Sequence, residues 1–512
     1  MPEHLRTLVV LLALATAVFI LAKGLVVGTS LALADYRRRR NLWFALTLVV
    51  FLAYDYWVYV GAAGVILHMA RSREPNRIAM YFFLLFAVPA IAQDISGLGV
   101  VKYFFTIDYL RLLALVVLLP TYLDLRRQPQ TEPFGRTLAD KLVAGHLILG
   151  FFLIWAASTF THGLRAGVFY AFVDVFLPYY VASRYVKDLQ GIQDALTSFV
   201  VAALVLSAVA AFESARHWLL YAPLPAALGT TWSYGGYLER GEGVLRAQAS
   251  VGHAIPLGYT IAVAIGMHLF LRTRVKRPAL WLLALALLVA GIISPVSRGG
   301  WLGAAAIALV YAAMGSSRIA GAARTALAAA AAGGALIASG AGEGLKELLN
   351  LSAVAEDYTV SYRQKLLQVG VQVVLQRPLF GAYDYMLSPA MQEMRQGQGI
   401  IDIVNTYLGV ALSSGLVGLA LFTGIFLSVL ARLFRSVRSQ EGGGESRVLG
   451  QALFATLIGI MIMIASTASI TVVPIIYWTL LGFGAAYVRM VSGAPPSTGP
   501  VADGRYRASR RG

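Results

Sequence analysis

The feature that most constrains this chain is a succession of long apolar runs, most of them about 17–28 residues in length. A helix needs about 20 apolar residues to cross the hydrocarbon core of a bilayer, because each residue advances it by about 1.5 Å. Hydrophobic residues make up 58% of the 512 residues and charged residues only 13%, which is too few to cover a water-soluble domain. We therefore predict an integral membrane protein and exclude a soluble globular enzyme.

The apolar runs also predict the fold class. In lipid every backbone polar group must find a partner within its own segment, so we expect each run to be a helix. The predicted spans are 8–34, 42–70, 78–97, 108–124, 137–156, 166–182, 192–214, 253–271, 278–294, 300–314, 320–340, 403–430, 448–466 and 472–490. The expected fold is all-α, a polytopic integral membrane protein with about 12–14 transmembrane helices and a large extracytoplasmic loop.

The basic loops predict the orientation. The chain carries 42 Lys and Arg against 25 Asp and Glu, and cytoplasmic loops of membrane proteins collect such an excess. Alternating spans bring the clusters 71–77, 126–136, 184–187, 271–277 and 432–438 and the C-terminal tail to one side, which should be the cytoplasm. The cluster 37–40 conflicts with this pattern, because a single span at 42–70 would put it opposite 71–77. Either 42–70 is a re-entrant hairpin with polar Asp55 at its centre, or the rule fails at one cluster.

This assignment divides the chain into consecutive parts. They are an N-terminal transmembrane bundle (1–214), an extracytoplasmic loop (215–252), central transmembrane helices with the turn Ser297–Gly300 (253–340), a large extracytoplasmic loop (341–402), C-terminal transmembrane helices (403–490) and a basic cytoplasmic tail (491–512). The residues that could carry chemistry gather in the parts predicted on the non-cytoplasmic side.

The clearest candidate is Arg298, in the motif SRGGWLG at Ser297–Gly303. It occupies a very short turn between two apolar runs, on the side where positive charge opposes the loop bias. Gly299 and Gly300 would let the backbone approach a ligand closely. A guanidinium here can bind phosphate through two hydrogen bonds; the alternative is that Arg298 reaches the lipid head groups.

A second candidate is Arg246, in the segment RAQASVGH at 246–253, which leads directly into the span 253–271. The N-terminus of a helix favours an anion, so Arg246, Gln248 and His253 are placed to line an anion site. His253 alone is also typical of a helix cap or of a packed residue.

The loop 341–402 carries further candidates. The stretch Leu366–Leu375 has an amphipathic pattern and predicts a helix along the membrane surface or over a cavity. Arg363, just before it, is either a surface salt-bridge partner or a third cation for the substrate. Asp402 precedes the span 403–430 and is either its N-cap or a carboxylate that accepts a proton from a sugar hydroxyl.

The sequence contains no nucleotide-binding glycine loop, no zinc-ligand spacing and no carboxylate run suited to Mg²⁺. It also has no cysteine, which excludes thiolate chemistry. We therefore expect no metal and no cofactor, and a donor that arrives already activated.

These segments together resemble the O-antigen ligase and polymerase family of bacterial membrane glycosyltransferases. The resemblance runs in order through Arg246–Gly258, Ser297–Gly303, Tyr362–Arg363, Arg377–Gly381 (RPLFG), Asn405–Leu408 (NTYL) and Ser414–Gly418 (SGLVG). The first half of the chain is similar to the family only as a hydrophobic multi-span protein.

The resemblance implies metal-independent transfer of a glycan from undecaprenyl pyrophosphate to a glycan or lipid-linked acceptor. The enzyme would lie in the bacterial inner membrane with its site facing the periplasm, its partner would be the lipid bilayer, and no nucleic acid is expected. The resemblance further implies arginines that hold the pyrophosphate, here Arg298 and Arg246 with Arg363 as a third. The implied substrate-lining residues are Gln248, Ser297, Gly299, Asn405 and Tyr407.

One position departs from the resembled family. Its ligases carry a histidine just before the asparagine that follows the long loop, and this chain has Val404 beside Asn405. Asp402 or His253 then stays as the candidate base. The departure favours a polymerase of exopolysaccharide or O-antigen repeats over a ligase to lipid A core. A lipid transporter or flippase is the third hypothesis, but its charges should spread through the membrane midplane, whereas the candidates here gather on one side.

Overall fold

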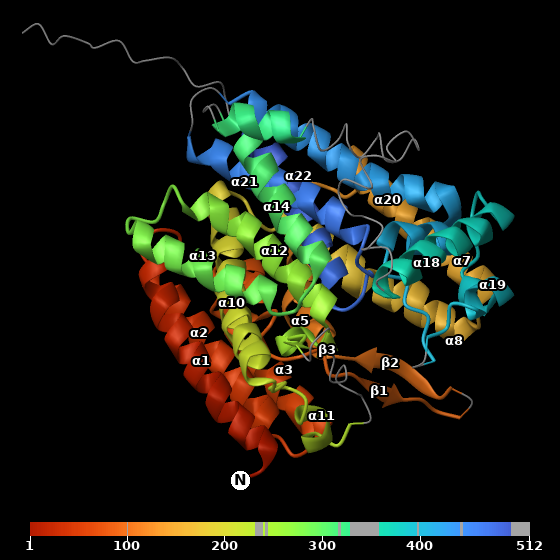
Figure 1. The fold of residues 1–512 in the computed structure, drawn as a ribbon, viewed down its shortest axis with the longest axis horizontal. Coiled ribbons are helices and arrows are strands. Elements are labelled where there is room, and N and C mark those ends of the chain that lie inside the picture. Colours follow the sequence, from red (N-terminus) through yellow and green to blue (C-terminus); the bar gives the residue numbers. More distant parts are fainter. Residues whose placement is uncertain are drawn as a thin grey trace, which may run out of the picture.

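The computed structural model describes residues 1–99, 101–230, 239–240, 244–315, 319–327, 358–396, 399–440 and 444–492. Most of the predicted helix 320–340, the first part of the predicted loop 341–402 and nearly all of the predicted tail 491–512 lie outside these residues. The described chain is a bundle of helices with a small β-hairpin (Figure 1).

The elements follow one another along the chain, and two sets of them run on without a break: α5, η1 and α6, and α8, η2 and α9. The elements are α1 (Glu3–Val26), α2 (Leu33–Leu52), α3 (Tyr56–Ser72), α4 (Arg77–Leu84), β1 (Gln93–Ser96), β2 (Tyr103–Ile107), α5 (Tyr109–Leu113), η1 (Ala114–Leu118), α6 (Leu119–Arg126), α7 (Leu138–Ala157), α8 (Phe160–His162), η2 (Gly163–Phe176), α9 (Leu177–Arg184), α10 (Leu189–Arg216), α11 (Leu224–Ala227), β3 (Glu239–Arg240), β4 (Val244–Leu245), η3 (Ala249–Val251), α12 (Ala254–Leu271), α13 (Pro278–Ile293), α14 (Arg298–Ala313), α18 (Tyr358–Gln376), η4 (Tyr385–Leu387), α19 (Pro389–Gln392), α20 (Thr406–Arg438), α21 (Glu445–Ile464) and α22 (Val472–Ser492).

Within the described residues, eight helices are long and apolar enough to cross a membrane. They are Glu3–Val26, Leu138–Ala157, Phe160–Arg184, Leu189–Arg216, Ala254–Leu271, Thr406–Arg438, Glu445–Ile464 and Val472–Ser492, and the shorter apolar helices α13 and α14 accompany them. This confirms the predicted all-α polytopic membrane fold. The total of about 12–14 spans stays a prediction.

The structure resolves the conflict over the span 42–70 in favour of a hairpin. The chain breaks at 53–55, and α3 returns beside α2. Asp55 is the N-cap of α3, because one of its carboxylate oxygens accepts hydrogen bonds from the backbone N–H groups of Trp57 (2.8 Å) and Val58 (3.2 Å). The two basic clusters therefore lie at the same end of the bundle.

The predicted helix 78–97 is mostly not a helix, which corrects the expectation that every apolar run is one. Only α4 is helical, and the chain then continues without regular structure into β1, which pairs antiparallel with β2. Side chains from elsewhere satisfy the freed carbonyls. Tyr109 donates to Leu84 O (2.7 Å), and Ser250 donates to Phe86 O (2.7 Å). Because residues 78–88 are all buried within protein, irregular backbone is tolerated there.

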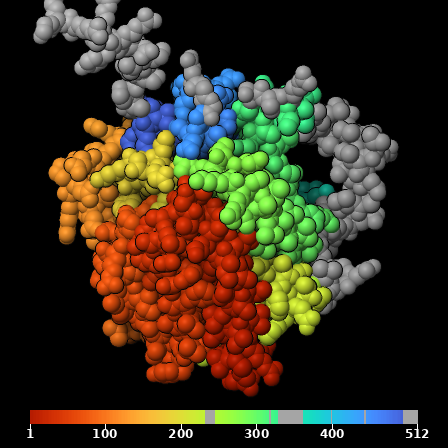
Figure 2. All heavy atoms as spheres, turned by 90° about the vertical axis from the view of Figure 1, so that its left-hand side faces the viewer, coloured from red at the N-terminus to blue at the C-terminus, as the bar shows by residue number. Residues whose placement is uncertain are grey.

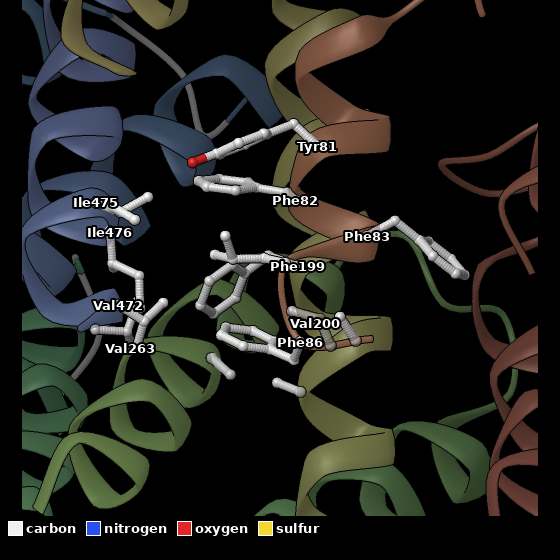
Figure 3. Packing of buried hydrophobic residues seen from close by; sticks show 14 of the residues in the cluster. Tyr81, Phe82, Phe83, Phe86, Phe199, Val200, Val263, Val472, Ile475 and Ile476 are labelled. Carbon is white, nitrogen blue, oxygen red and sulfur yellow. The ribbon is translucent and has the colours of Figure 1, made fainter. Parts of the chain in front are cut away.

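The core of the bundle lies where this buried segment meets α10 and α22. Phe199 of α10 packs edge-on against Phe82 and Phe86, with ring centroids 5.1 Å and 5.4 Å apart. Figure 3 shows Ile475 and Ile476 of α22 facing the same rings. The N-terminal helices, in red, cover one face of the molecule, with α13 in green beside them (Figure 2).

The bundle has two chemically different ends. Helices α12, α20 and α22 run from one end, which we call the site end, to the other, which we call the basic end. The basic end is defined by ion pairs between loops and helix ends. These pairs are Arg39–Glu74, Arg184–Asp140, Arg274–Glu445 and Arg489–Glu132. The site end holds the N-termini of α12, α14, α20 and α22.

Candidate functional site

The connection between α13 and α14 is as short as the sequence predicts, but it lies earlier in the chain. Residues 294–297 form the connection, and Ser297 occupies the N-cap position of α14. Arg298 is the first residue of α14, and its side chain is exposed. Val296 has a φ of +47°, a left-handed conformation that is strained for a β-branched residue. Strain of this kind persists only where neighbouring contacts fix the backbone.

The glycines after Arg298 serve the packing of helices. A Cβ on Gly300 would lie 2.8 Å from the backbone of Gly258 in α12, and one on Gly299 would lie 2.6 Å from Ser466 Oγ. A Cβ on Gly303 would lie 2.2 Å from Met463 of α21. The space next to Gly300 is therefore filled by α12. The sequence had led us to expect that this glycine lets the backbone approach a ligand, and that expectation is wrong.

The segment that carries Arg246 lies against the turn between α13 and α14. Arg246 Nε donates to the carbonyl of Pro295 (3.1 Å), and the N–H of Ala247 donates to the carbonyl of Ser294 (3.2 Å). Arg246 is thus bound to Pro295, which lies three residues before Arg298, the first residue of α14. We call this unit, residues 246–247 with 294–298, the arginine turn.

The sequence analysis missed the residue that anchors the segment after Arg246. Glu213, in the last turn of α10, is fully buried. One of its carboxylate oxygens accepts from the N–H groups of Gln248 (2.9 Å) and Ala249 (2.8 Å), and the other from the N–H of Leu220 (3.0 Å). A carboxylate near the end of an apolar run was the available signal, because such groups rarely lie there without a structural or functional partner.

His253 occupies the N-cap position of α12, but its side chain makes no capping hydrogen bond. It is half-buried, and burial lowers the pKa of its imidazole below the ordinary 6.5. His253 therefore does not cap α12 through its side chain, and its role as a base stays a prediction.

Asp402 is not the N-cap of α20. That position belongs to Asn405, whose side-chain oxygen accepts from the N–H of Leu408 (3.1 Å). The backbone of Asp402 is bound at both groups by the hydroxyl of Tyr362, which donates to its carbonyl (3.1 Å) and accepts from its N–H (3.2 Å). The capping alternative for Asp402 is therefore wrong.

The carboxyl group of Asp402 is half-buried, and this burial raises its pKa above the ordinary 3.8. The positive charge of nearby Arg363 acts in the opposite direction. The structure thus brings Arg363 and Asp402 into one neighbourhood, next to the start of α20. The role of Asp402 as the base that accepts a proton from a sugar hydroxyl stays a prediction.

Two of the predicted substrate-lining groups are occupied by the fold. The side-chain oxygen of Asn405 is used in the helix cap, and the hydroxyl of Tyr407 donates to Met461 O (2.9 Å), which ties α20 to α21. Val404, which stands where the resembled ligases carry a histidine, is buried in an apolar cluster with Ile403 and Leu408. A base at this position would need a different packing.

The motifs at 377–381 and 414–418 form one structural unit. Helix α20 breaks at Gly415, where φ is +66°. The backbone of the first motif fills the break. Pro378 O accepts from the N–H of Leu416 (2.8 Å), and Leu379 O accepts from the N–H of Val417 (3.2 Å). These bonds satisfy the groups that the break frees, so α20 can be discontinuous inside the bundle.

Contacts between neighbouring elements link the arginine turn to the region of Arg363 and Asp402. Ile255, two residues after His253, packs against the apolar cluster that contains Val404. On the other side, Thr406 Oγ1 donates to Thr467 O (2.7 Å), one residue from the Ser466 that lies against Gly299. The starts of α12, α14 and α20, which carry His253, Arg298 and Asn405, therefore lie at the same end of the bundle.

Comparison with known protein families finds a match to part of the chain. The model of the O-antigen ligase family matches residues 283–423. A search of curated proteins gives no match to the chain. The matched residues include Arg298, Arg363 and Asp402, whereas Arg246 and His253 lie before them.

Proposed function

We propose, on the premise that this multi-pass membrane protein carries the O-antigen ligase family domain at residues 283–423, that it transfers a glycan from a polyprenyl pyrophosphate carrier to an acceptor sugar. The family supports glycan transfer of the ligase or polymerase type. The polyprenyl pyrophosphate donor, the side of the membrane that the site faces and the choice between ligase and polymerase are our proposals.

The observation that carries the proposal is the arginine turn. It places Arg246 beside the N-terminus of a 16-residue helix whose first residue is Arg298. Guanidinium groups form paired hydrogen bonds with phosphate oxygens, and a helix N-terminus adds backbone N–H donors and a positive dipole end. The two together form a site suited to a diphosphate.

The reaction needs charge stabilisation at this place. The oxygen of the acceptor hydroxyl forms a bond to the anomeric carbon of the donor sugar, and the bond from that carbon to the pyrophosphate oxygen breaks. The electron pair of the broken bond leaves with the carrier pyrophosphate. Fixed cations at the arginine turn stabilise this charge as it develops, without a metal.

The proton of the acceptor hydroxyl must go to a base. We assign Asp402, because it lies in the family-matched range, its pKa is raised by burial and Arg363 lies near it. His253, at the start of α12, is the second candidate. Either base must be deprotonated to act, so substitution of Asp402 separates the two.

We further propose that the chain is a polymerase of glycan repeats, in the bacterial inner membrane with the site end facing the periplasm. Support comes from Val404, which replaces the family histidine with a buried apolar side chain. The alternatives are a ligase to lipid A core and a lipid flippase.

Deleting the gene and examining the surface glycan tests this proposal. A polymerase predicts that long chains disappear while single repeats remain on lipid A. Loss of all repeats from lipid A would show a ligase instead. Unchanged glycan after deletion would contradict glycan transfer altogether.

A further inference from the structure

A cavity of about 470 Å³ lies at the basic end, on the other side of the molecule from the arginine turn. It is open to the surface and is lined by the start of α7, the end of α9 and the ends of α20 and α22. Its charged lining residues are Glu132, Asp140, Arg184, Arg432, Arg435 and Arg489. Four arginines against two carboxylates leave two positive charges uncompensated.

The two carboxylates are already used by the protein. Asp140 accepts from Arg184 Nη2 (2.7 Å) and from the hydroxyl of Tyr179 (3.0 Å). Glu132 lies 3.5 Å from Arg489 Nη1. Arg184 is almost fully buried and also donates to the Glu132 carbonyl (3.0 Å), so its role in the cavity wall is structural.

The arginines of α20 have no such partners. Arg432 and Arg435 are exposed, and in the described part of the chain neither makes an ion pair; Arg435 Nε donates only to the carbonyl of Ala431 in its own helix. Arg489 is oriented by the carbonyl of Ser183 (2.7 Å) and remains 36% exposed. Three guanidinium groups with unused donors thus line one cavity.

The apolar lining residues lie on the side of the cavity that faces the middle of the bundle. Val429 on α20 and Ala485 on α22 lie about one turn further into each helix than the arginines at 432 and 489, and Val488 directly precedes Arg489. The cavity is therefore apolar toward the middle of the bundle and cationic at the helix ends. A ligand with an anionic head and an apolar continuation fits this order.

We infer that the cavity binds the phosphodiester head group of an anionic membrane lipid. Basic pockets between the cytoplasmic ends of membrane helices have the chemistry to bind such head groups, and the guanidinium fork matches phosphate oxygens. The general excess of arginine in cytoplasmic loops explains the number of cations but not their convergence on one cavity.

Thermal unfolding of the full-length protein in an uncharged detergent, after removal of bound lipid, tests this inference. Phosphatidylglycerol should raise the midpoint of unfolding saturably, and phosphatidylcholine should not. In the double variant Arg432→Gln, Arg435→Gln, the apparent affinity for phosphatidylglycerol should fall at least tenfold. The matched control is Arg73→Gln, Arg438→Gln, which removes two exposed charges from the same end outside the cavity and should respond like the wild type.

Wild-type affinity for phosphatidylglycerol in both double variants would overturn the site. An equally reduced affinity in both would also overturn it, because general surface charge would then account for binding. A shift of the same size with inorganic phosphate would assign the cavity to a free anion and overturn the lipid. If the double variant does not fold, each single substitution is measured in the same way, and wild-type affinity in both overturns the site.

Discussion

The two ends of the bundle use arginine in different ways. At the basic end Arg39 is fully buried between Glu74 (2.7 Å) and Asp194 (2.5 Å), so its charge is compensated within the fold. At the site end the Nε of Arg246 donates to the carbonyl of Pro295, and this bond orients the guanidinium beside the start of α14. The comparison teaches that residue type alone does not separate the two arginines, whereas burial does: Arg39 is fully buried and Arg246 is only partly buried.

The largest expected effect belongs to the basic end. Arg39→Ala leaves Asp194 without its cation and Glu74 with Arg38 alone, which should cost about 3–5 kcal/mol of stability and remove most of the inserted protein. The measurement is the amount and thermal stability of protein in the membrane. Arg37→Ala, which removes an exposed charge two residues away, is the control and should leave both near wild type.

At the site end the expected loss is of activity and not of stability. Arg298→Ala should reduce glycan transfer by roughly 10²–10³-fold, since one fixed donor to the developing charge is lost, while insertion stays normal. The assay is the length distribution of the glycan product together with the level of inserted protein. Arg395→Ala, an exposed arginine outside the arginine turn, should keep normal transfer. Normal glycan length in Arg298→Ala would remove the pyrophosphate role.

Asp402→Asn separates the two candidate bases. The substitution should reduce transfer by about 10²-fold if Asp402 accepts the proton. A carboxylate works only when ionised, so wild-type activity should fall as the pH falls through the pKa of Asp402, which burial holds above 3.8. The remaining activity of the variant should lack this acid limb. Persistence of the limb with full activity would assign the base to His253.

The smallest expected effect concerns Glu213, as a positioning residue. Glu213→Gln puts an amide N–H₂ group against at least one of the three N–H donors that the carboxylate now accepts, so the segment after Arg246 should shift. We expect the KM for the donor to rise about tenfold, with a smaller change in kcat. Ser214→Ala, next to it, should change neither. A fall in kcat alone would contradict positioning through Arg246.

The sequence predicted the uninterrupted helices well. The spans predicted at 137–156 and 192–214 correspond to α7 and α10 within three residues at each end. Hydropathy averaged over about 20 residues is sufficient there, because lipid imposes both the length and the helical conformation.

The interrupted segments could not be predicted in this way. The backbone between Leu84 and Ala90 is satisfied by side chains such as Tyr109 and Ser250, and the break at Gly415 is filled by the motif at 377–381. Such contacts join residues far apart in the sequence, so a local average does not contain them.

The site shows the same division. The structure places Arg246 at the turn before Arg298 and Arg363 near Asp402, while the predicted roles of these residues in substrate binding and catalysis stay predictions. The anchoring by Glu213 and the cap by Asn405 became visible only in three dimensions.

The account rests on the arginine turn holding a diphosphate, and the affinity for a short-chain polyprenyl pyrophosphate tests this most directly. The purified wild type, Arg246→Ala, Arg298→Ala and the double variant would be compared, with the matching polyprenyl monophosphate as control ligand. We expect each single substitution to weaken binding of the pyrophosphate at least tenfold, and the double variant to lose less than the product of the two, because both groups bind one ligand. Unchanged affinity in both single variants would contradict the account.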